Sequence, residues 1–157
     1  MRFALVDNIV ELVPGERIVA VKAVSLAEEY LADHFPTFPI LPGVLMLQAM
    51  VEAATWLVRD ATDFTPALIL LREAKNVTYK SFVKPGDVLT LDVACRRLTP
   101  DESDFDGVGT CHQAEVVKAR FGLRHIHPAD DERVAAACVE SRTSDLKARF
   151  ALLRRGS

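Results

Sequence analysis

The chain has 157 residues, of which 50% are hydrophobic and 26% charged, and a formal net charge of -3. A chain of this length and apolar content can bury one core, which predicts one main domain. The scattered basic residues exclude a general attraction to nucleic acid. Because Arg59 and Asp60 close the longest apolar run, no run reaches the length of a membrane span, and the first residues lack the order of a signal peptide. We therefore expect a cytoplasmic protein without a membrane span.

The first elements are predicted from a turn and a cap. Residues 9–24 place two β-rich runs around the sequence VPGE, which is typical of a hairpin. Ser25 and Glu28 have the spacing of a capping box, which predicts a short helix or helical turn over residues 25–33. Three prolines between residues 36 and 42 then exclude a helix and fix a stiff loop.

The next element is a long helix that begins near Gly43 and runs to about Arg59. Proline just before the first turn, followed by leucine, methionine and alanine, favours this start. The helix is nearly all apolar, and the exceptions are Gln48, Glu52, Thr55 and Arg59. Their spacing of four, three and four places them on one stripe, so the rest of the helix is expected to be buried over a wide arc.

Strand-rich segments follow at residues 67–83, 88–98 and 107–126, with a turn at residues 84–87. The acidic segment TPDESDFDG, residues 99–107, is expected to be a solvated hairpin tip rather than a calcium loop. In a calcium loop counted from Glu102, the twelfth position would be Gln113, where such loops have a bidentate glutamate. One long helix with four to six hairpin-connected strands predicts an α+β fold in which an antiparallel sheet wraps the helix.

The chain from residue 130 onward reads as one or two short helices, with Leu146, Phe150 and Leu153 on one face. We therefore divide the chain into a main domain, residues 1–127, and a helical or partly disordered C-terminal extension, residues 128–157. The extension is expected to pack on the main domain or on a neighbouring subunit.

The cysteines and the paired histidines give no metal site in the sequence. Cys95, Cys111 and Cys138 show neither C-x-x-C spacing nor the density of a disulfide framework, so we interpret them as reduced thiols. His125 and His127 form an H-x-H without a cysteine or carboxylate at ligand spacing, which favours polar positions at a strand end. We predict no metal ligands.

Two features at the proline loop suggest chemistry. His34 precedes the buried helix on a stiff loop and is a candidate general acid or base, although a histidine that bonds a loop carbonyl fits the spacing equally well. The first amides of the helix, at Gly43 and Val44, offer a site for an oxygen that gains negative charge. On the polar stripe we interpret Thr55 and Arg59 as a wet face.

The segment HFPTFPILPGVLMLQAM, residues 34–50, resembles the signature of the (3R)-hydroxyacyl-acyl carrier protein dehydratases of the FabZ/FabA type. Segments before and after it are also similar, so the resemblance covers about residues 3–123. It implies a hot dog fold, a long central helix wrapped by an antiparallel sheet. It also implies pairing of two subunits, as a homodimer or a hexamer built as a trimer of dimers, with active sites at the interface.

The resemblance further implies reversible loss of water from a 3-hydroxyacyl thioester of acyl carrier protein or CoA, giving the trans-2-enoyl thioester in fatty acid or related lipid biosynthesis. No metal or organic cofactor is implied. His34 matches the histidine that takes the proton from C2, and Gly43 matches the glycine at the helix start. Phe35, Pro42 and Val44 are expected to join Gly43 in binding the substrate.

The chain departs from the family pattern at the second catalytic position. Gln48 stands where the family has glutamate or aspartate, and an amide cannot deliver a proton as a carboxyl group does. Glu52, one turn later, is the nearest carboxylate and a candidate replacement, and Thr37 stands where the motif usually has glycine. The candidate catalytic residues are thus His34, Gln48 and Glu52.

Three functions remain open at this point. The first is a working dehydratase in which Glu52, or His34 with an ordered water, supplies the proton. The second is a hot dog thioesterase with Glu52 as base or nucleophile. The third is a noncatalytic acyl-binding or partner subunit of a complete dehydratase. No sequence motif specifies the acyl chain length or distinguishes acyl carrier protein from CoA as the carrier.

Overall fold

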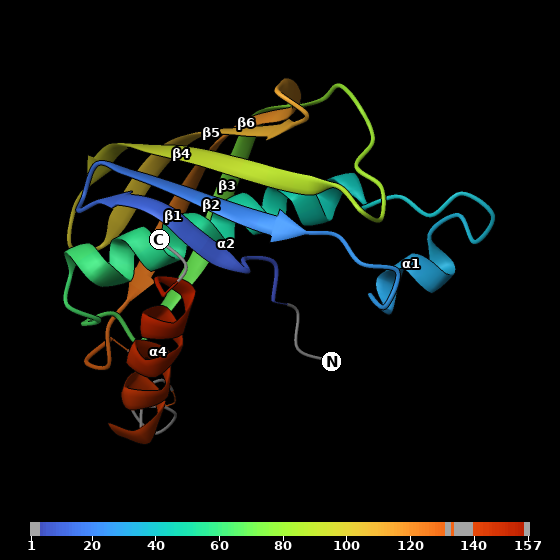
Figure 1. Ribbon diagram of the computed structural model, residues 1–157. Helices are drawn as coiled ribbons and strands as arrows, with labels where there is room; N and C mark the ends of the chain where they lie inside the picture. Colours follow the sequence, from blue (N-terminus) through green and yellow to red (C-terminus); the bar gives the residue numbers. More distant parts are fainter. Residues whose placement is uncertain (1–3, 131–132, 134–139, 156–157) are drawn as a thin grey trace.

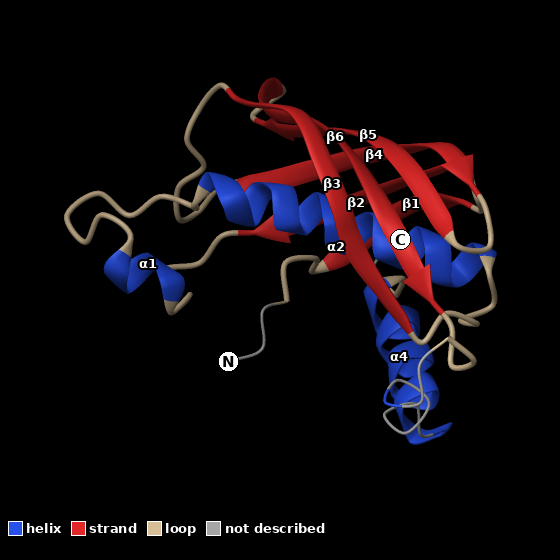
Figure 2. Cartoon of the chain, turned by 180° about the vertical axis from the view of Figure 1, so that it is seen from behind, coloured by secondary structure: helices blue, strands red, loops and turns tan. Residues whose placement is uncertain are grey.

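The computed structural model describes residues 4–130, 133 and 140–155. Six antiparallel strands form one sheet in the order β1-β2-β4-β5-β6-β3, so β1 and β3 are its edges. The sheet curves over one long helix, α2, Gly43–Ala61, as Figures 1 and 2 show. The strands are β1 (Asn8–Val13), β2 (Arg17–Ala23), β3 (Leu68–Tyr79), β4 (Val88–Leu98), β5 (Glu102–Cys111) and β6 (Ala114–Ile126).

The inner face of the sheet is made by alternate residues of each strand, as the period of two requires. In β4 these are Leu89, Leu91 and Val93, each fully buried. In β5 a glycine takes one inward position, and a Cβ at Gly107 would lie 2.8 Å from the sulfur of Met50 in α2. The glycine therefore lets the helix approach the middle of the sheet closely. The hot dog arrangement expected from the sequence is confirmed.

Helix α2 begins and ends close to its predicted bounds. It follows Pro42, and its buried residues form the expected wide arc, which includes Met46, Met50 and Trp56. Two residues with positive φ, Asp63 and Phe64, follow the helix. Within the described ranges, none of the helices has both the length and the apolar content needed to cross a membrane.

The first hairpin is confirmed, and the short helix or helical turn predicted over residues 25–33 is a single turn, α1, Tyr30–Asp33. The predicted capping box does not form. Ser25 accepts the amide of Ala27 at 3.1 Å, and the carboxylate of Glu28 lies 2.6 Å from the ammonium of Lys22. Lys22 is buried, and a buried charge is costly unless it is paired. The carboxylate of Glu28 therefore pairs with Lys22 instead of capping the helix.

The segment 107–126, read above as one strand-rich run, contains a turn. His112 and Gln113 have φ of 50° and 64° and join β5 to β6 as a two-residue hairpin. A turn of this kind usually carries asparagine or glycine, so the sequence gives little sign of it.

The acidic segment 99–107 is a hairpin tip only at residues 99–101, between β4 and β5, so the prediction was wrong for the rest of it. Most of it lies inside β5, where acidic side chains meet arginines of neighbouring strands. Asp104 contacts Arg72 at 2.8 Å and Arg97 at 2.7 Å. Cross-strand pairs of opposite charge stabilise a sheet, and they place these carboxylates on its outer face.

The C-terminal extension contains helix α4, Glu140–Leu153, as expected. Phe150 stacks on Trp56 of α2, with ring centroids 5.8 Å apart, and also meets Phe64 edge to face. Leu153 is buried in the same core. In this chain α4 thus packs on its own α2, while residues 131–132 and 134–139 lie outside the described part. The boundary at residue 127 stays a prediction.

Candidate active site

A cavity of about 440 Å³ lies between the proline loop, the start of α2 and the end of β3. The loop contributes His34, α2 contributes Gly43 and Met46, and the segment after β3 contributes Phe82. Figure 1 shows α1 and the proline loop projecting beyond the sheet on the side where α2 begins. The stiff loop predicted from the prolines therefore forms one wall of the cavity.

His34 is held in one tautomer by its loop. Its Nδ1 lies 2.9 Å from the carbonyl oxygen of Ile40. A carbonyl only accepts, so Nδ1 carries the hydrogen and the neutral ring keeps its lone pair on Nε2. Phe35, which has φ of 57°, packs edge to face on the imidazole at a centroid distance of 4.7 Å. The histidine is therefore both bonded to a loop carbonyl and equipped to accept a proton.

The start of α2 presents free backbone donors beside this histidine. The carbonyl of Pro42 accepts the amides of Leu45 at 2.9 Å and Met46 at 3.2 Å. The amides of Gly43 and Val44 come before these, where a helix offers no intrahelical acceptor. They and the positive end of the helix dipole can bind a developing negative charge.

Gly43 is also closely packed. A Cβ at this position would lie 3.0 Å from the ring of Tyr79 at the end of β3. Tyr79 and the adjacent Lys80 and Ser81 line the cavity, and they were not predicted as catalytic or substrate-binding residues. Their only signal was their place within the predicted strand-rich segment 67–83, in a stretch that resembles the family.

Gln48 is exposed on α2, one turn after the exposed Val44. Within the described part of this single chain, the cavity wall includes His34, Phe35 and Gly43 but neither Gln48 nor Glu52. The structure thus brings the histidine and the helix start together and leaves Gln48 on an uncovered face of the helix.

Glu52 has partners within the chain. Its Oε2 accepts the amide of Leu5 at 2.8 Å, and its Oε1 lies 3.1 Å from Nη2 of Arg149 in α4. Burial raises the pKa of Glu52, while the Leu5 amide and Arg149 act in the opposite direction. Arg149 had no signal in the sequence, because it is 97 residues away.

The last members of the polar stripe differ from the wet face predicted for them. Arg59 is buried, and its Nη1 donates to the carbonyl of Pro66 at 3.2 Å. Thr55 is half-buried and donates to the carbonyl of Val51 at 2.8 Å. The prediction was wrong for Arg59, because the chain that leaves the helix folds back and covers its guanidinium.

The paired histidines at the end of β6 agree with the structural interpretation. Nδ1 of His125 donates to the carbonyl of Pro100 at 2.9 Å, and its Nε2 lies 2.9 Å from Oγ of Ser103. Nε2 of His127 donates to the same Pro100 carbonyl. Burial lowers the pKa of His125, which favours the neutral ring.

Comparison with known proteins gives a family match over most of the chain. The model of the FabA-like domain matches residues 1–120. The FabZ 3-hydroxyacyl-[acyl-carrier-protein] dehydratase of Ruminiclostridium cellulolyticum is 43% identical over 57% of this chain and 63% of its own length. The FabZ dehydratase of Polaromonas sp. is 36% identical over 74% of this chain and 83% of its own length, and that of Granulibacter bethesdensis is 31% identical over 85% and 80%.

Solved structures share the fold at low sequence identity. The dehydratase heterocomplex ApeI:P from Xenorhabdus doucetiae matches with a TM-score of 0.67 and 17% identity, over 81% of this chain and 86% of the other. Smu.793 from Streptococcus mutans, bound to acetyl CoA, matches with a TM-score of 0.59 and 17% identity, over 81% and 94%. With the family model and the FabZ relatives, these likenesses confirm the resemblance, and the chain belongs to the FabA-like domain family with a hot dog fold.

Proposed function

We propose that this protein is a 3-hydroxyacyl-acyl carrier protein dehydratase, a hydro-lyase that interconverts 3-hydroxyacyl and trans-2-enoyl thioesters. The observation that carries the proposal is His34, whose Nδ1 is bound to the Ile40 carbonyl beside the free amides at the start of α2. The FabZ relatives, which are named as dehydratases of this substrate, support the same reaction.

The first step is removal of a proton from C2 of the substrate. With Nδ1 donating to Ile40, the lone pair of Nε2 is the acceptor for this proton. The amides of Gly43 and Val44 donate to the thioester carbonyl and stabilise the negative charge that develops on its oxygen. Gly43 has no side chain, so the ring of Tyr79 packs closely against the helix start and lines the cavity beside these amides.

The second step breaks the bond between C3 and the hydroxyl group. In our proposal the side-chain amide of Gln48 from a second copy of the chain holds this hydroxyl by hydrogen bonds, since Gln48 does not line the His34 cavity of its own chain. The proton that it needs returns from Nε2 of the His34 imidazolium, directly or through a water. The histidine thus gains a proton from C2 and loses it to the leaving hydroxide, and the products are the enoyl thioester and water.

Glu52 is the alternative source of that proton. Its raised pKa suits an acid, but both of its oxygens already have partners, Leu5 and Arg149. These contacts favour His34 over Glu52 as the donor. The role of Glu52 in the reaction stays a prediction, which a Glu52→Gln variant tests directly.

The proposed active unit is a homodimer. Strand β3 is an edge of the sheet, and Leu70 and Leu71 on it are exposed by 47% and 42%. A long edge strand with exposed apolar residues favours pairing with another strand. Pairing with β3 of a second copy would bring a partner towards the uncovered face of α2 that carries Gln48. A hexamer of three such dimers stays a prediction, as does the cytoplasmic location.

The cavity mouth fits an acyl thioester. Phe35 and Phe82 line the cavity with His34, and Phe38 packs edge to face on Phe82; the exposures of Phe35, Phe38 and Phe82 are 58%, 51% and 62%. Such an apolar rim favours an acyl chain or a covering partner. Acyl carrier protein is the proposed carrier, because the FabZ relatives are named for it, and CoA thioesters are the alternative.

The experiment measures hydration of trans-2-enoyl-acyl carrier protein and the reverse dehydration, over several chain lengths, with the matching CoA thioesters beside them. Turnover that is lost in His34→Ala supports the proposal. Light scattering on the parent and on Leu71→Lys tests the dimer: a parent dimer that dissociates in the variant agrees, and a parent monomer contradicts it.

A noncatalytic partner subunit is the second candidate, and Gln48 is the observation that favours it. The fold neighbour from Xenorhabdus doucetiae is described as a dehydratase heterocomplex, so dehydratases of this fold can contain two different chains. This candidate predicts acyl binding without turnover by the pure protein, and turnover only with a carboxylate-bearing homologue. A thioesterase would instead release free thiol, and loss of that release in Glu52→Gln would identify it.

A further inference from the structure

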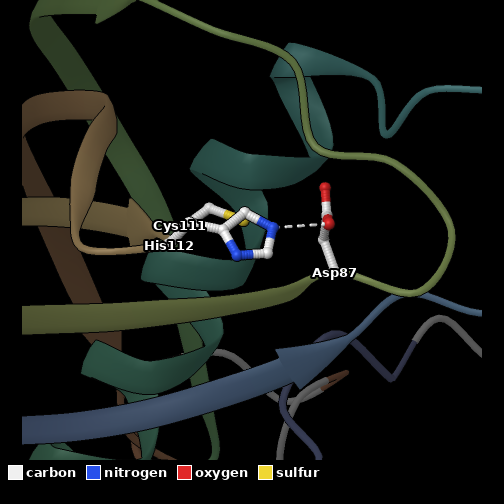
Figure 3. Close-up of side chains that lie close together, drawn as sticks. All are labelled: Asp87, Cys111 and His112. Atoms are coloured by element: carbon white, nitrogen blue, oxygen red, sulfur yellow. Dashed lines mark hydrogen bonds and ion pairs between the residues drawn. The ribbon is translucent and has the colours of Figure 1, made fainter.

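A second cluster of reactive side chains lies away from the His34 cavity wall. Asp87 directly precedes β4, Cys111 is the last residue of β5, and His112 is the first residue of the turn to β6. Figure 3 shows the three side chains converging between the β5–β6 turn and the loop that leads into β4. One ligand atom from each residue lies within 4.8 Å of the other two. Among the described residues, this is the group of three that has metal-ligand spacing.

The positions of the cluster are held by backbone contacts. Oδ2 of Asp87 accepts the amide of Lys84 at 2.9 Å, and the carbonyl of Asp87 accepts the amide of Val24 at 3.0 Å. These bonds fix the loop and leave Oδ1 facing Nε2 of His112 at 2.8 Å. The side chain of His112 is 77% exposed, so it can turn, whereas Cys111 is buried at the inner side of the turn.

The three donors are the types that zinc prefers. Zn²⁺ binds thiolate, imidazole and carboxylate in a tetrahedron, with ligand atoms about 3.3 to 3.7 Å apart given metal–ligand distances of about 2.0 to 2.3 Å. The cluster needs to close by roughly 1 Å to reach this geometry, and the exposed His112 can supply the movement. We propose that Asp87, Cys111 and His112 bind a divalent transition metal ion of the zinc type, with water as the fourth ligand.

Binding would tie the β5–β6 turn to the loop before β4. The same loop, residues 80–87, carries Lys80, Ser81 and Phe82, which line the His34 cavity. The ion would therefore clamp one wall of that cavity without taking part in the acyl chemistry. Because the thiolate is the ligand, binding releases the proton of Cys111 to solvent. The site does not depend on the function proposed for His34.

The test uses cobalt as a spectroscopic substitute for zinc. The full chain with Cys95→Ser and Cys138→Ser keeps Cys111 as its one thiol, so a cobalt–thiolate charge-transfer band in this protein reports that residue. We expect one Co²⁺ per chain with this band, displaced by Zn²⁺ but not by Mg²⁺. Absence of the band at saturating Co²⁺ would overturn the proposal.

Two histidine variants identify the second ligand. His112→Asn keeps a residue that tolerates the positive φ of this turn but removes the imidazole, and we expect Co²⁺ affinity to fall about tenfold or more. His127→Ala is the matched control and should leave the affinity unchanged. In thermal unfolding, Zn²⁺ should raise the Tm of the parent more than that of His112→Asn at the same concentration. Equal affinities in parent and His112→Asn, or equal losses in both histidine variants, contradict the proposal.

Discussion

Oε1 of Glu52 in the central helix lies 3.1 Å from Nη2 of Arg149 in the C-terminal helix. The other oxygen of Glu52 accepts the amide of Leu5 from the start of the chain. One carboxylate therefore joins three segments that are far apart in the sequence. Glu52 is also the nearest carboxylate to Gln48 on the polar stripe. Its contacts with Leu5 and Arg149 therefore bear on whether Glu52 or His34 protonates the leaving hydroxyl.

Replacing Glu52 by glutamine should leave most dehydration activity in place. The amide oxygen of glutamine can still accept the Leu5 amide, and in our account His34 supplies the proton. We expect kcat within about threefold of the parent, since a group that does not transfer a proton in the rate-limiting step contributes little to it. A loss of about a hundredfold in a folded Glu52→Gln protein would instead identify Glu52 as the acid.

The same substitution should change how stability depends on pH. Burial raises the pKa of Glu52 in the folded chain above its unfolded value, so the folded state binds the proton more tightly. The stability that this adds is fully present below the unfolded pKa and is lost as the pH rises through the folded pKa. The Tm of the parent minus that of Glu52→Gln should therefore fall as the pH rises above 4.5.

Arg149→Gln provides the companion measurement for that pH series. Arg149 opposes the effect of burial on the pKa of Glu52, so its removal should move the decline in stability to higher pH. Each Tm series is recorded by circular dichroism in matched buffers. A difference curve that is flat, or that rises with pH, would contradict the assigned burial of Glu52.

Restoring a carboxylate at position 48 should increase the dehydration rate. Gln48 is exposed on α2 in the single chain, so glutamic acid fits there without repacking the core. A positioned general acid contributes about 100-fold or more, and we expect kcat of Gln48→Glu to rise by about ten- to a hundredfold. Thr55→Glu, on the same stripe two turns later, is the control and should give no gain. An unchanged rate in Gln48→Glu would show that position 48 does not face the substrate.

Adding a methyl group at Gly43 should impair catalysis more than folding. The new Cβ would lie 3.0 Å from the ring of Tyr79, and the helix start or the ring must shift. Tyr79 is 46% exposed, so it can yield at modest cost to stability. Because oxyanion donors act only at correct distances, we expect kcat/KM of Gly43→Ala to fall about tenfold or more. Val44→Ala keeps the backbone amide that our mechanism uses and trims only an exposed side chain, so its kcat/KM should stay near that of the parent.

The sequence predicted those parts of the fold that depend on local pattern. The three prolines between residues 36 and 42 and Gly43 predicted the loop and the start of α2, and the turn at VPGE predicted the first hairpin. The turn at His112 was missed because its residues lack the usual turn chemistry. The strand position of Asp104 was missed because its arginine partners come from other strands.

The site was predictable to the extent that it is continuous in sequence. His34 and Gly43 lie in one motif and share one cavity wall. Tyr79 reaches the cavity from the far end of β3, and Arg149 reaches Glu52 from α4, so only the folded chain reveals them. Burial of Arg59 likewise depends on a carbonyl in the following loop.

The central claim is that His34 performs the acid and base steps of dehydration in a chain that has glutamine at position 48. The most direct measurement is the rate at which the purified protein interconverts 3-hydroxyacyl- and trans-2-enoyl-acyl carrier protein, compared between the parent and His34→Ala of equal circular dichroism. We expect measurable turnover in the parent and a loss of about 100-fold or more in His34→Ala. Absence of turnover in the parent at every chain length, or equal rates in the two proteins, would contradict the claim.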